Sequence, residues 1–138
     1  MTDLRVADGD DELAERLDKE LTEFNERATG VEVRELSARV TGDDGELVGG
    51  LTGWTWGDCG FVEMLWVHED HRHGGWGGKL LRAAEEEALR RGCVRMVVAS
   101  YTFQAPPFYR RQGYAEIGRI EGMPGGHADV HFCKALAS

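Results

Sequence analysis

The chain has 138 residues, of which 41% are hydrophobic and 30% are charged, and its formal net charge at pH 7 is −9. This length is enough for one folded domain with a hydrophobic core. The acidic balance disfavours nucleic acid and anionic membranes as main partners and is compatible with a cationic small molecule. No apolar stretch approaches the roughly 20 residues of a membrane span, and the acidic first residues are unlike a signal peptide, so we expect a cytoplasmic protein. The three cysteines lack a CxxC spacing, which favours reduced thiols over disulfides or a zinc site.

The N-terminal part of the chain predicts a short strand followed by an amphipathic helix. Residues 3–6 (DLRV) have the composition of a strand. The apolar residues that follow are spaced four, four and three residues apart, at Leu13, Leu17, Leu21 and Phe24. This spacing places them on one face of a helix. Asp8 or Asp10 is expected to cap this helix and Gly30 to end it.

Three strands are expected next. Residues 36–40 alternate apolar and polar side chains, and an Asp-Gly turn separates them from residues 46–56, which predicts a hairpin. Residues 61–67 (FVEMLWV) are apolar on both faces except at Glu63. That pattern is typical of a central strand that is covered on both sides.

The remaining elements alternate between helix and strand. A narrow stripe of Leu80, Leu81, Ala84 and Ala88 predicts a helix that ends at Gly92. Residues 94–100 predict a buried strand, residues 105–112 a short helix, and residues 113–120 and 128–136 two final strands. Since there is no internal repeat and no linker, we expect one domain over residues 1–138, with helices packed on a mixed sheet.

Glycines gather between the strand at 61–67 and the helix that follows, at Gly74, Gly75, Gly77 and Gly78. The first N–H groups of a helix lack partners and attract anions, and glycine lets an anion approach the backbone closely. Arg72 and Lys79 add positive charge, so the segment suits a pyrophosphate, although such turns also occur as tight connections. The ATP-binding pattern GxxxxGK[ST] and the dinucleotide pattern GxGxxG are both absent.

Two motifs in register resemble those of the GNAT superfamily of N-acetyltransferases. Residues 72–77 (RHGGWG) fit its acetyl-CoA signature [Q/R]-x-x-G-x-[G/A], after the strand and turn LWVHEDHR, and APPFYRRQGY resembles its A-x-x-x-Y-x-x-x-G-[F/Y] segment. The resemblance runs over nearly the whole chain and is strongest from residue 61 to 114. It implies an α/β (α+β) fold with a mixed, mostly antiparallel sheet of six to seven strands, about four flanking helices and splayed central strands.

The resemblance also implies acetyl-CoA as cosubstrate. Main-chain groups of Leu65, Trp66 and Val67 would bind the pantetheine arm. The pyrophosphate would be wrapped by Arg72, His73, Gly74, Gly75, Trp76, Gly77, Gly78 and Lys79. Thr102 stands where many members have asparagine, which puts one hydrogen bond to the cofactor in doubt. Many members are homodimers, and the same state is expected here.

Acetyl transfer to an amine requires a base for the ammonium group and an acid for the departing thiolate. Glu63 is the predicted base, because desolvation within an apolar strand raises the pKa of a carboxyl group and because it is expected to point to the same side as Leu65 and Val67. A structural carboxylate paired with an arginine is the alternative. Tyr109 matches the tyrosine that protonates the thiolate in many family members, and its alternative role is a core aromatic.

The histidines give weaker signals. His68, His71 and His73 lack an established spacing of metal ligands, so no metal is expected. His127 and His131 could line the acceptor pocket or lie on the surface, and Asn25 could reach the acceptor or form a local cap. The cysteines lack a neighbouring base in sequence, so a thiol nucleophile has no support.

The expected function is acetyl transfer from acetyl-CoA by direct attack of a primary amine of a small, cationic molecule. Retention of Tyr109 together with an acidic residue in the central strand favours an enzyme. A non-catalytic acyl-CoA sensor, or an acetyltransferase for protein lysines or N-termini, is the alternative. The sequence does not identify the acceptor or the preferred acyl chain.

Overall fold

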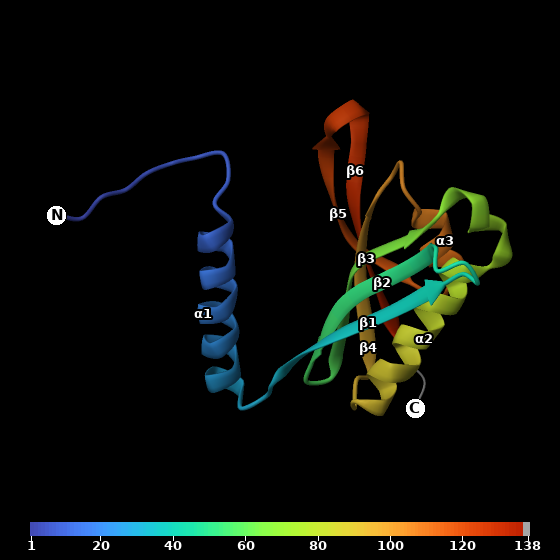
Figure 1. Ribbon diagram of the computed structural model, residues 1–138, viewed down its shortest axis with the longest axis horizontal. Helices are drawn as coiled ribbons and strands as arrows, with labels where there is room; N and C mark the ends of the chain where they lie inside the picture. Colours follow the sequence, from blue (N-terminus) through green and yellow to red (C-terminus); the bar gives the residue numbers. More distant parts are fainter. Residues whose placement is uncertain (137–138) are drawn as a thin grey trace. The chain divides into compact units, whose positions relative to one another are not determined.

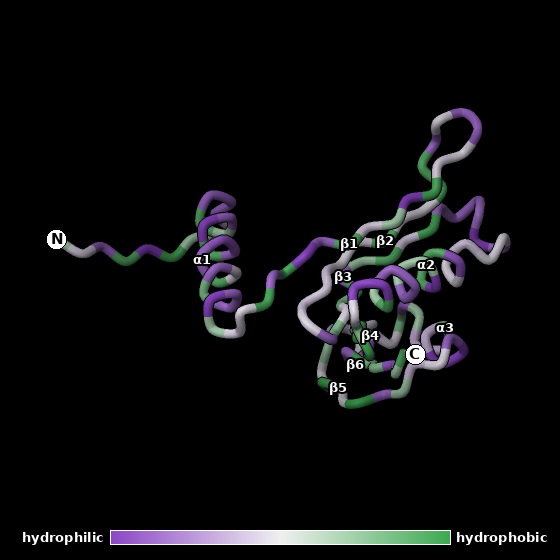
Figure 2. The backbone as a smooth tube through the Cα atoms, turned by 90° about the horizontal axis from the view of Figure 1, so that it is seen from below, coloured by the Kyte–Doolittle hydropathy of each residue, from purple (hydrophilic) through white to green (hydrophobic). Residues whose placement is uncertain are grey.

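A computed structural model describes residues 1–136, in which the chain forms two compact units. The first unit, Met1–Val33, contains helix α1 (Asp11–Thr29), and Figure 2 shows hydrophobic residues interspersed among hydrophilic ones along it. Asp10 caps α1 by accepting the Leu13 N–H at 3.0 Å, and Gly30 ends it with φ at 70°, so the predicted helix and both caps are confirmed. The strand predicted for residues 3–6 is wrong, because this segment pairs with no neighbouring strand and an unpaired strand is not stable.

The second unit begins at Arg34 and contains one six-stranded sheet in the order β1-β2-β3-β4-β6-β5 (Figure 1). The strands are β1 (Val33–Thr41), β2 (Leu47–Trp56), β3 (Cys59–Val67), β4 (Arg95–Tyr101), β5 (Ala115–Met123) and β6 (His127–Ala135). The helices are α2 (Trp76–Arg90) and α3 (Pro106–Arg111), with 3₁₀ turns η1 (Glu69–Gly74) and η2 (Pro124–Gly126). β3 and β4 are parallel, whereas β2–β3, β4–β6 and β5–β6 are antiparallel. The predicted mixed, mostly antiparallel fold is confirmed.

The hydrophobic core lies between α2, α3 and one face of the sheet. Leu80, Leu81, Ala84 and Ala88 of α2 are all buried, as their spacing predicted. Leu81 packs in one cluster with Met96 of β4 and with Val130 and Phe132 of β6. On the opposite face of the sheet, Met64 and Trp66 of β3 are left partly exposed by the other residues of the second unit.

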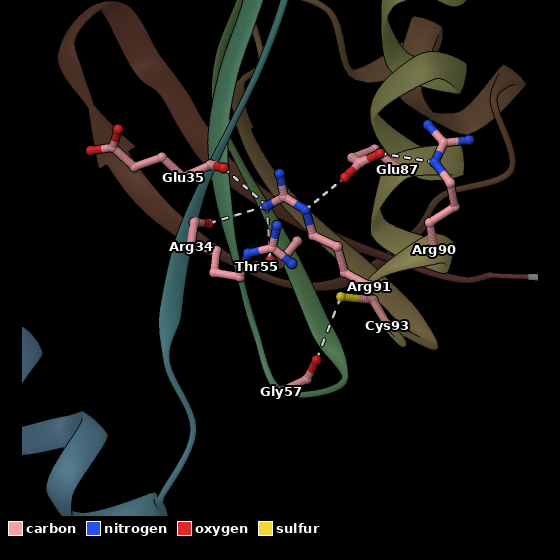
Figure 3. Close-up of polar contacts among 8 residues, drawn as sticks. All are labelled: Arg34, Glu35, Thr55, Gly57, Glu87, Arg90, Arg91 and Cys93. Carbon is pink, nitrogen blue, oxygen red and sulfur yellow. Dashed lines mark hydrogen bonds and ion pairs between the residues drawn. The ribbon is translucent and has the colours of Figure 1, made fainter.

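Arg91 joins the end of α2 to the first two strands (Figure 3). Its Nη1 donates to the main-chain oxygen of Glu35 at 2.9 Å and to the Thr55 hydroxyl at 3.1 Å, and its Nε donates to Glu87 at 2.9 Å. The Cys93 thiol next to it lies 3.6 Å from the Gly57 carbonyl oxygen, and burial raises the pKa of this thiol. These contacts fix the C-terminal end of α2 against β1 and β2.

A buried polar network joins α2 to the segments that follow α3. The Tyr114 hydroxyl donates to Oε2 of the buried Glu85 at 2.7 Å, and Lys134 of β6 donates to Oε1 of the same carboxylate at 3.0 Å. Burial and the Glu85 carboxylate both raise the pKa of Tyr114. Since each partner of this carboxylate comes from a different element, the network holds α2 and β6 in a fixed relation.

No helix among residues 1–136 combines the length and the apolar character that crossing a membrane requires.

Candidate active site

The two central strands separate part of the way along the sheet. β3 pairs with β4 only from Cys59–Arg95 to Phe61–Val97, yet β3 continues to Val67 and β4 to Tyr101. We call the divergence beyond Phe61 and Val97 the fork; Figure 1 shows β3 leading from it towards η1 and α2. Main-chain groups of β3 that face β4 beyond Phe61 therefore have no strand partner there, which leaves them available to a ligand.

A β-bulge at Glu63 sets the shape of β3 at the fork. Gly53 of β2 pairs with Val62 and Thr52 with Met64, so Glu63 is the extra residue. A bulge inverts the alternation of side chains, and the burial pattern accordingly changes after Val62. Glu63 is exposed together with Met64. The prediction that it points to the same side as Leu65 and Val67 is wrong, and the desolvation on which its predicted role rested is absent.

Gly53 permits this bulge. A Cβ atom at this position would collide with the main-chain oxygen of Phe61, so only glycine allows the close approach of the two strands. Our sequence reasoning did not identify Gly53 as important. The available signal was a glycine inside a strand pattern, which often marks a bulge or a close backbone approach.

The glycine-rich segment forms η1 and the start of α2. Gly75 lies between them with φ at 74°, in the left-handed region that favours glycine. The first bond of α2 runs from the Lys79 N–H to the Gly75 oxygen at 3.1 Å, which leaves the N–H groups of Trp76, Gly77 and Gly78 unbonded within the helix. This is the helix start expected of an anion site.

One later glycine in this segment also serves packing. A Cβ on Gly78 would lie 3.1 Å from the Arg82 guanidinium and 3.3 Å from the Gln112 side chain, whereas one on Gly77 would make an ordinary contact of 3.4 Å with the Phe108 ring. Gly78 is buried. Its small size thus lets the end of α3 approach the first turn of α2, a role that the sequence analysis did not separate from anion binding.

Two cations flank the helix start. Arg72 donates from Nε to the Val67 main-chain oxygen at 2.9 Å, which holds its exposed side chain at the end of β3. The Lys79 ammonium lies 4.4 Å from the centre of the Trp76 ring, a cation–π contact. Together with the free N–H groups, these cations make the first turn of α2 electropositive.

The histidines of η1 have local partners. The His68 Nδ1 accepts the Asp70 N–H at 3.1 Å and so caps η1. His71 lies 3.5 Å from the Glu46 carboxylate, and His73 is exposed. Within residues 1–136, no group of three or more metal-ligating side chains comes together.

Tyr109 lies on α3 and is buried against Phe108, Tyr114 and Phe132. Burial raises the pKa of its hydroxyl to about 12. Within residues 1–136, no hydrogen bond engages the Tyr109 hydroxyl. A protonated hydroxyl without an internal partner is a suitable proton donor.

The two predicted substrate contacts lie in different units. His127, at the start of β6, is held by the Thr102 hydroxyl, which lies 2.8 Å from its Nδ1 and also accepts the Ala128 N–H at 3.1 Å. Thr102 thus ties the end of β4 to the start of β6. Asn25 lies on α1 in the first unit, where its main-chain oxygen accepts the Thr29 hydroxyl at 2.8 Å.

Comparison with known proteins gives consistent results. A family model described as acetyltransferase (GNAT) family matches residues 2–114. The blasticidin-S acetyltransferase of Streptomyces morookaense is 38% identical over 107 residues, which cover 72% of this chain and 76% of that protein. An acetyltransferase of Agrobacterium fabrum is 35% identical over 95 residues and 69% of each chain. A crystal structure of an acetyltransferase from Bacillus cereus, 32% identical, superimposes with a TM-score of 0.79 and covers 96% of this chain and 98% of that chain.

Proposed function

Because this chain belongs to the acetyltransferase (GNAT) family and is by membership an N-acetyltransferase, as its motifs predicted, we propose that it transfers acetyl from acetyl-CoA to a primary amine of a small, cationic molecule. One observation carries the proposal: the fork between β3 and β4 leads directly to the glycine-rich start of α2. An elongated ligand with an anionic end fits this arrangement.

The residues present suit coenzyme A. Its pyrophosphate would be bound by the N–H groups of Trp76, Gly77 and Gly78 and by the charges of Arg72 and Lys79. Such a helix start is typical of phosphate sites, and the remaining residues of the segment, His73, Gly74 and Gly75, shape the turn. The main-chain groups of Leu65, Trp66 and Val67 that do not pair with β2 would offer hydrogen bonds to the pantetheine arm.

The thioester supplies an activated acetyl group, and the chain supplies proton transfer. We propose Tyr109 as the donor to the departing thiolate, because a hydroxyl with a pKa of about 12 is protonated at neutral pH. Glu63 is exposed at the fork. Its carboxylate can attract the substrate ammonium and is one candidate to accept its proton. No acyl-enzyme is required, since the amine attacks the thioester directly.

The acceptor class is tested with purified protein and a panel of amines. Blasticidin S belongs in the panel, since one relative is named for it, together with a polyamine, an aminoglycoside and a lysine peptide. Release of coenzyme A with one small amine, reduced about 100-fold in Tyr109→Phe at unchanged acetyl-CoA affinity, is the expected result. Tight binding of acetyl-CoA without turnover of any amine would instead support a sensor, and turnover of the peptide alone would support a protein acetyltransferase.

Two further expectations accompany this function. Action in the cytoplasm fits the free state of Cys59, Cys93 and Cys133. A homodimer is expected from the family resemblance, and light scattering coupled to size exclusion measures it.

A further inference from the structure

β6 presents a row of polar side chains on the sheet face away from α2. His127, Asp129 and His131 alternate with Ala128, Val130 and Phe132, which are all buried in the core. Residues two apart in a strand share a face, so the first three residues lie together on the opposite face.

Within this row, His131 and Asp129 form a close pair. The His131 Nε2 lies 3.1 Å from the Asp129 Oδ2, and their side chains are 46% and 21% exposed. An ionised carboxylate only accepts hydrogen bonds, so the neutral imidazole must carry its proton on Nε2. Its Nδ1 then keeps a lone pair. A carboxylate that fixes the imidazole tautomer in this way produces an oriented base.

The pair lies at the fork. His131 lines a cavity of about 190 Å³ whose other lining residues include Trp54, Phe61, Val97, Ala99 and Ile117. Phe61 and Val97 are the last residues at which β3 and β4 pair. His131 is opposite Ala99 of β4, two residues beyond Val97. The imidazole therefore borders the point at which the strands begin to diverge.

The cavity suits the reacting end of an amine. Its volume is a few times the roughly 30 Å³ that one water molecule occupies in the liquid, enough for an amino group and its nearest carbon atoms. The stacked rings of Trp54 and Phe61, 5.1 Å apart, form an apolar wall. An apolar cavity favours the neutral amine over the ammonium ion, provided that a base at its edge removes the proton.

We propose that His131 is a catalytic base for the acetyl transfer and that Asp129 is its positioning residue. This inference rests on the proposed function. One ammonium N–H bond breaks, its proton moves to Nδ1 of His131, and the nitrogen electron pair attacks the thioester carbonyl carbon. The C–S bond then breaks with its electrons on sulfur, and the thiolate receives a proton from the Tyr109 hydroxyl. The attacking nitrogen returns a proton to the Tyr109 oxygen, and His131 releases the first proton to solvent.

The residues that face His131 from the neighbouring strands carry no charge. Its register partners are Ala99 on β4 and Gly118 on β5, neither of which carries a titratable group. The facing residues of the cavity from β2 and β3 are Trp54 and Phe61. Asp129 is therefore the charged group in direct contact with the imidazole.

The first test uses the free protein. Long-range ¹H–¹⁵N NMR spectra assign the His131 signals by their loss in His131→Gln and report which ring nitrogen is protonated. The inference requires the Nε2–H tautomer at neutral pH in the wild type, and a weaker preference for that tautomer in Asp129→Asn. A His131 ring with its proton on Nδ1 would overturn the inference without reference to any activity.

The second test compares kcat/KM against pH for the wild type and four variants. His131→Gln should lower kcat/KM about 100-fold at neutral pH, the usual scale for a general base, and should remove the acidic limb of the profile. Asp129→Asn should lower kcat/KM less than His131→Gln does, because the base is kept and only its orientation is lost. Asp58→Asn is the matched control, since Asp58 forms an exposed ion pair with Arg95 at 2.9 Å on another part of the sheet, and should leave the profile unchanged.

Glu63→Gln separates the two candidate bases. If Glu63→Gln removes the acidic limb while His131→Gln keeps the wild-type profile and stability, His131 is not the base and the proposed function stands. If the wild type neither binds acetyl-CoA nor acetylates any amine, the proposed function fails and the inference fails with it. A melting temperature of His131→Gln within a few degrees of the wild type shows that its lower rate comes from loss of the base and not from loss of the fold.

Discussion

Replacement of Gly53 by alanine should damage both the stability of the sheet and the proposed acetyl-CoA site. The new Cβ would overlap the main-chain oxygen of Phe61 and would lie 3.0 Å from its carbonyl carbon. Relief requires β2 and β3 to separate by about 1 Å, which stretches N–H···O bonds of about 2.9 Å beyond the useful range. The bulge at Glu63 depends on this close approach, so the edge of β3 at the fork moves as well.

The expected loss of stability follows from these contacts. Two ladder hydrogen bonds contribute about 1 kcal/mol each, and overpacking adds about 1–3 kcal/mol. The free energy of unfolding should therefore fall by about 3–5 kcal/mol, a large part of the 5–15 kcal/mol typical of a domain. The acetyl-CoA affinity should fall about tenfold or more, because the main-chain groups beyond the bulge are displaced.

Gly50→Ala in the same strand is the matched control. Its Cβ would lie 3.4 Å from the Ala38 oxygen, an ordinary contact, so its stability should stay within about 0.5 kcal/mol of the wild type. Urea unfolding followed by tryptophan fluorescence measures both variants, and calorimetry with acetyl-CoA measures affinity. Equal stability and affinity of the two variants would refute the assignment of the bulge and its link to the fork.

Two other predictions concern the glycine turn and the buried tyrosine. Gly75→Ala places a Cβ in open space but at φ 74°, so it should lose about 1–2 kcal/mol of stability and also bind acetyl-CoA more weakly. Gly45→Ala in the β1–β2 turn, with φ 83° and equally open space, is the control and should lose the same stability at unchanged acetyl-CoA affinity. If calorimetry gives the two variants the same acetyl-CoA affinity, the proposed role of Gly75 is contradicted. The pKa of Tyr109 is raised from 10.0 to about 12 in the folded protein, so its contribution to stability is complete below pH 10 and is lost as the pH rises towards 12. Urea unfolding between pH 9 and 11.5 should therefore show a shallower decline for Tyr109→Phe than for the wild type, and parallel curves would contradict the burial of this hydroxyl.

Local patterns in the sequence predicted most of the helices and strands of this protein and the start of α2. The helix spacing of Leu13, Leu17 and Leu21 and the caps at Asp10 and Gly30 lie within single elements, where each residue interacts with close neighbours in the chain. The glycine segment before α2 and the motif around Tyr109 are local for the same reason, because a helix start binds anions through its own backbone. These features identified the fold class and the family without any long-range information.

Tertiary structure alone decided the orientation and burial of the side chains at the fork. The direction of Glu63 depends on a one-residue register shift against Gly53, and such a shift is set by the pairing of two strands. The cavity beside His131 is bounded by residues from five strands, β2 to β6, so no single segment could reveal it. The strand predicted for residues 3–6 failed because a strand exists only through its neighbours. The periodicity of apolar residues therefore determined the helices and strands, whereas pairing between distant strands determined which side chains meet at the proposed active site.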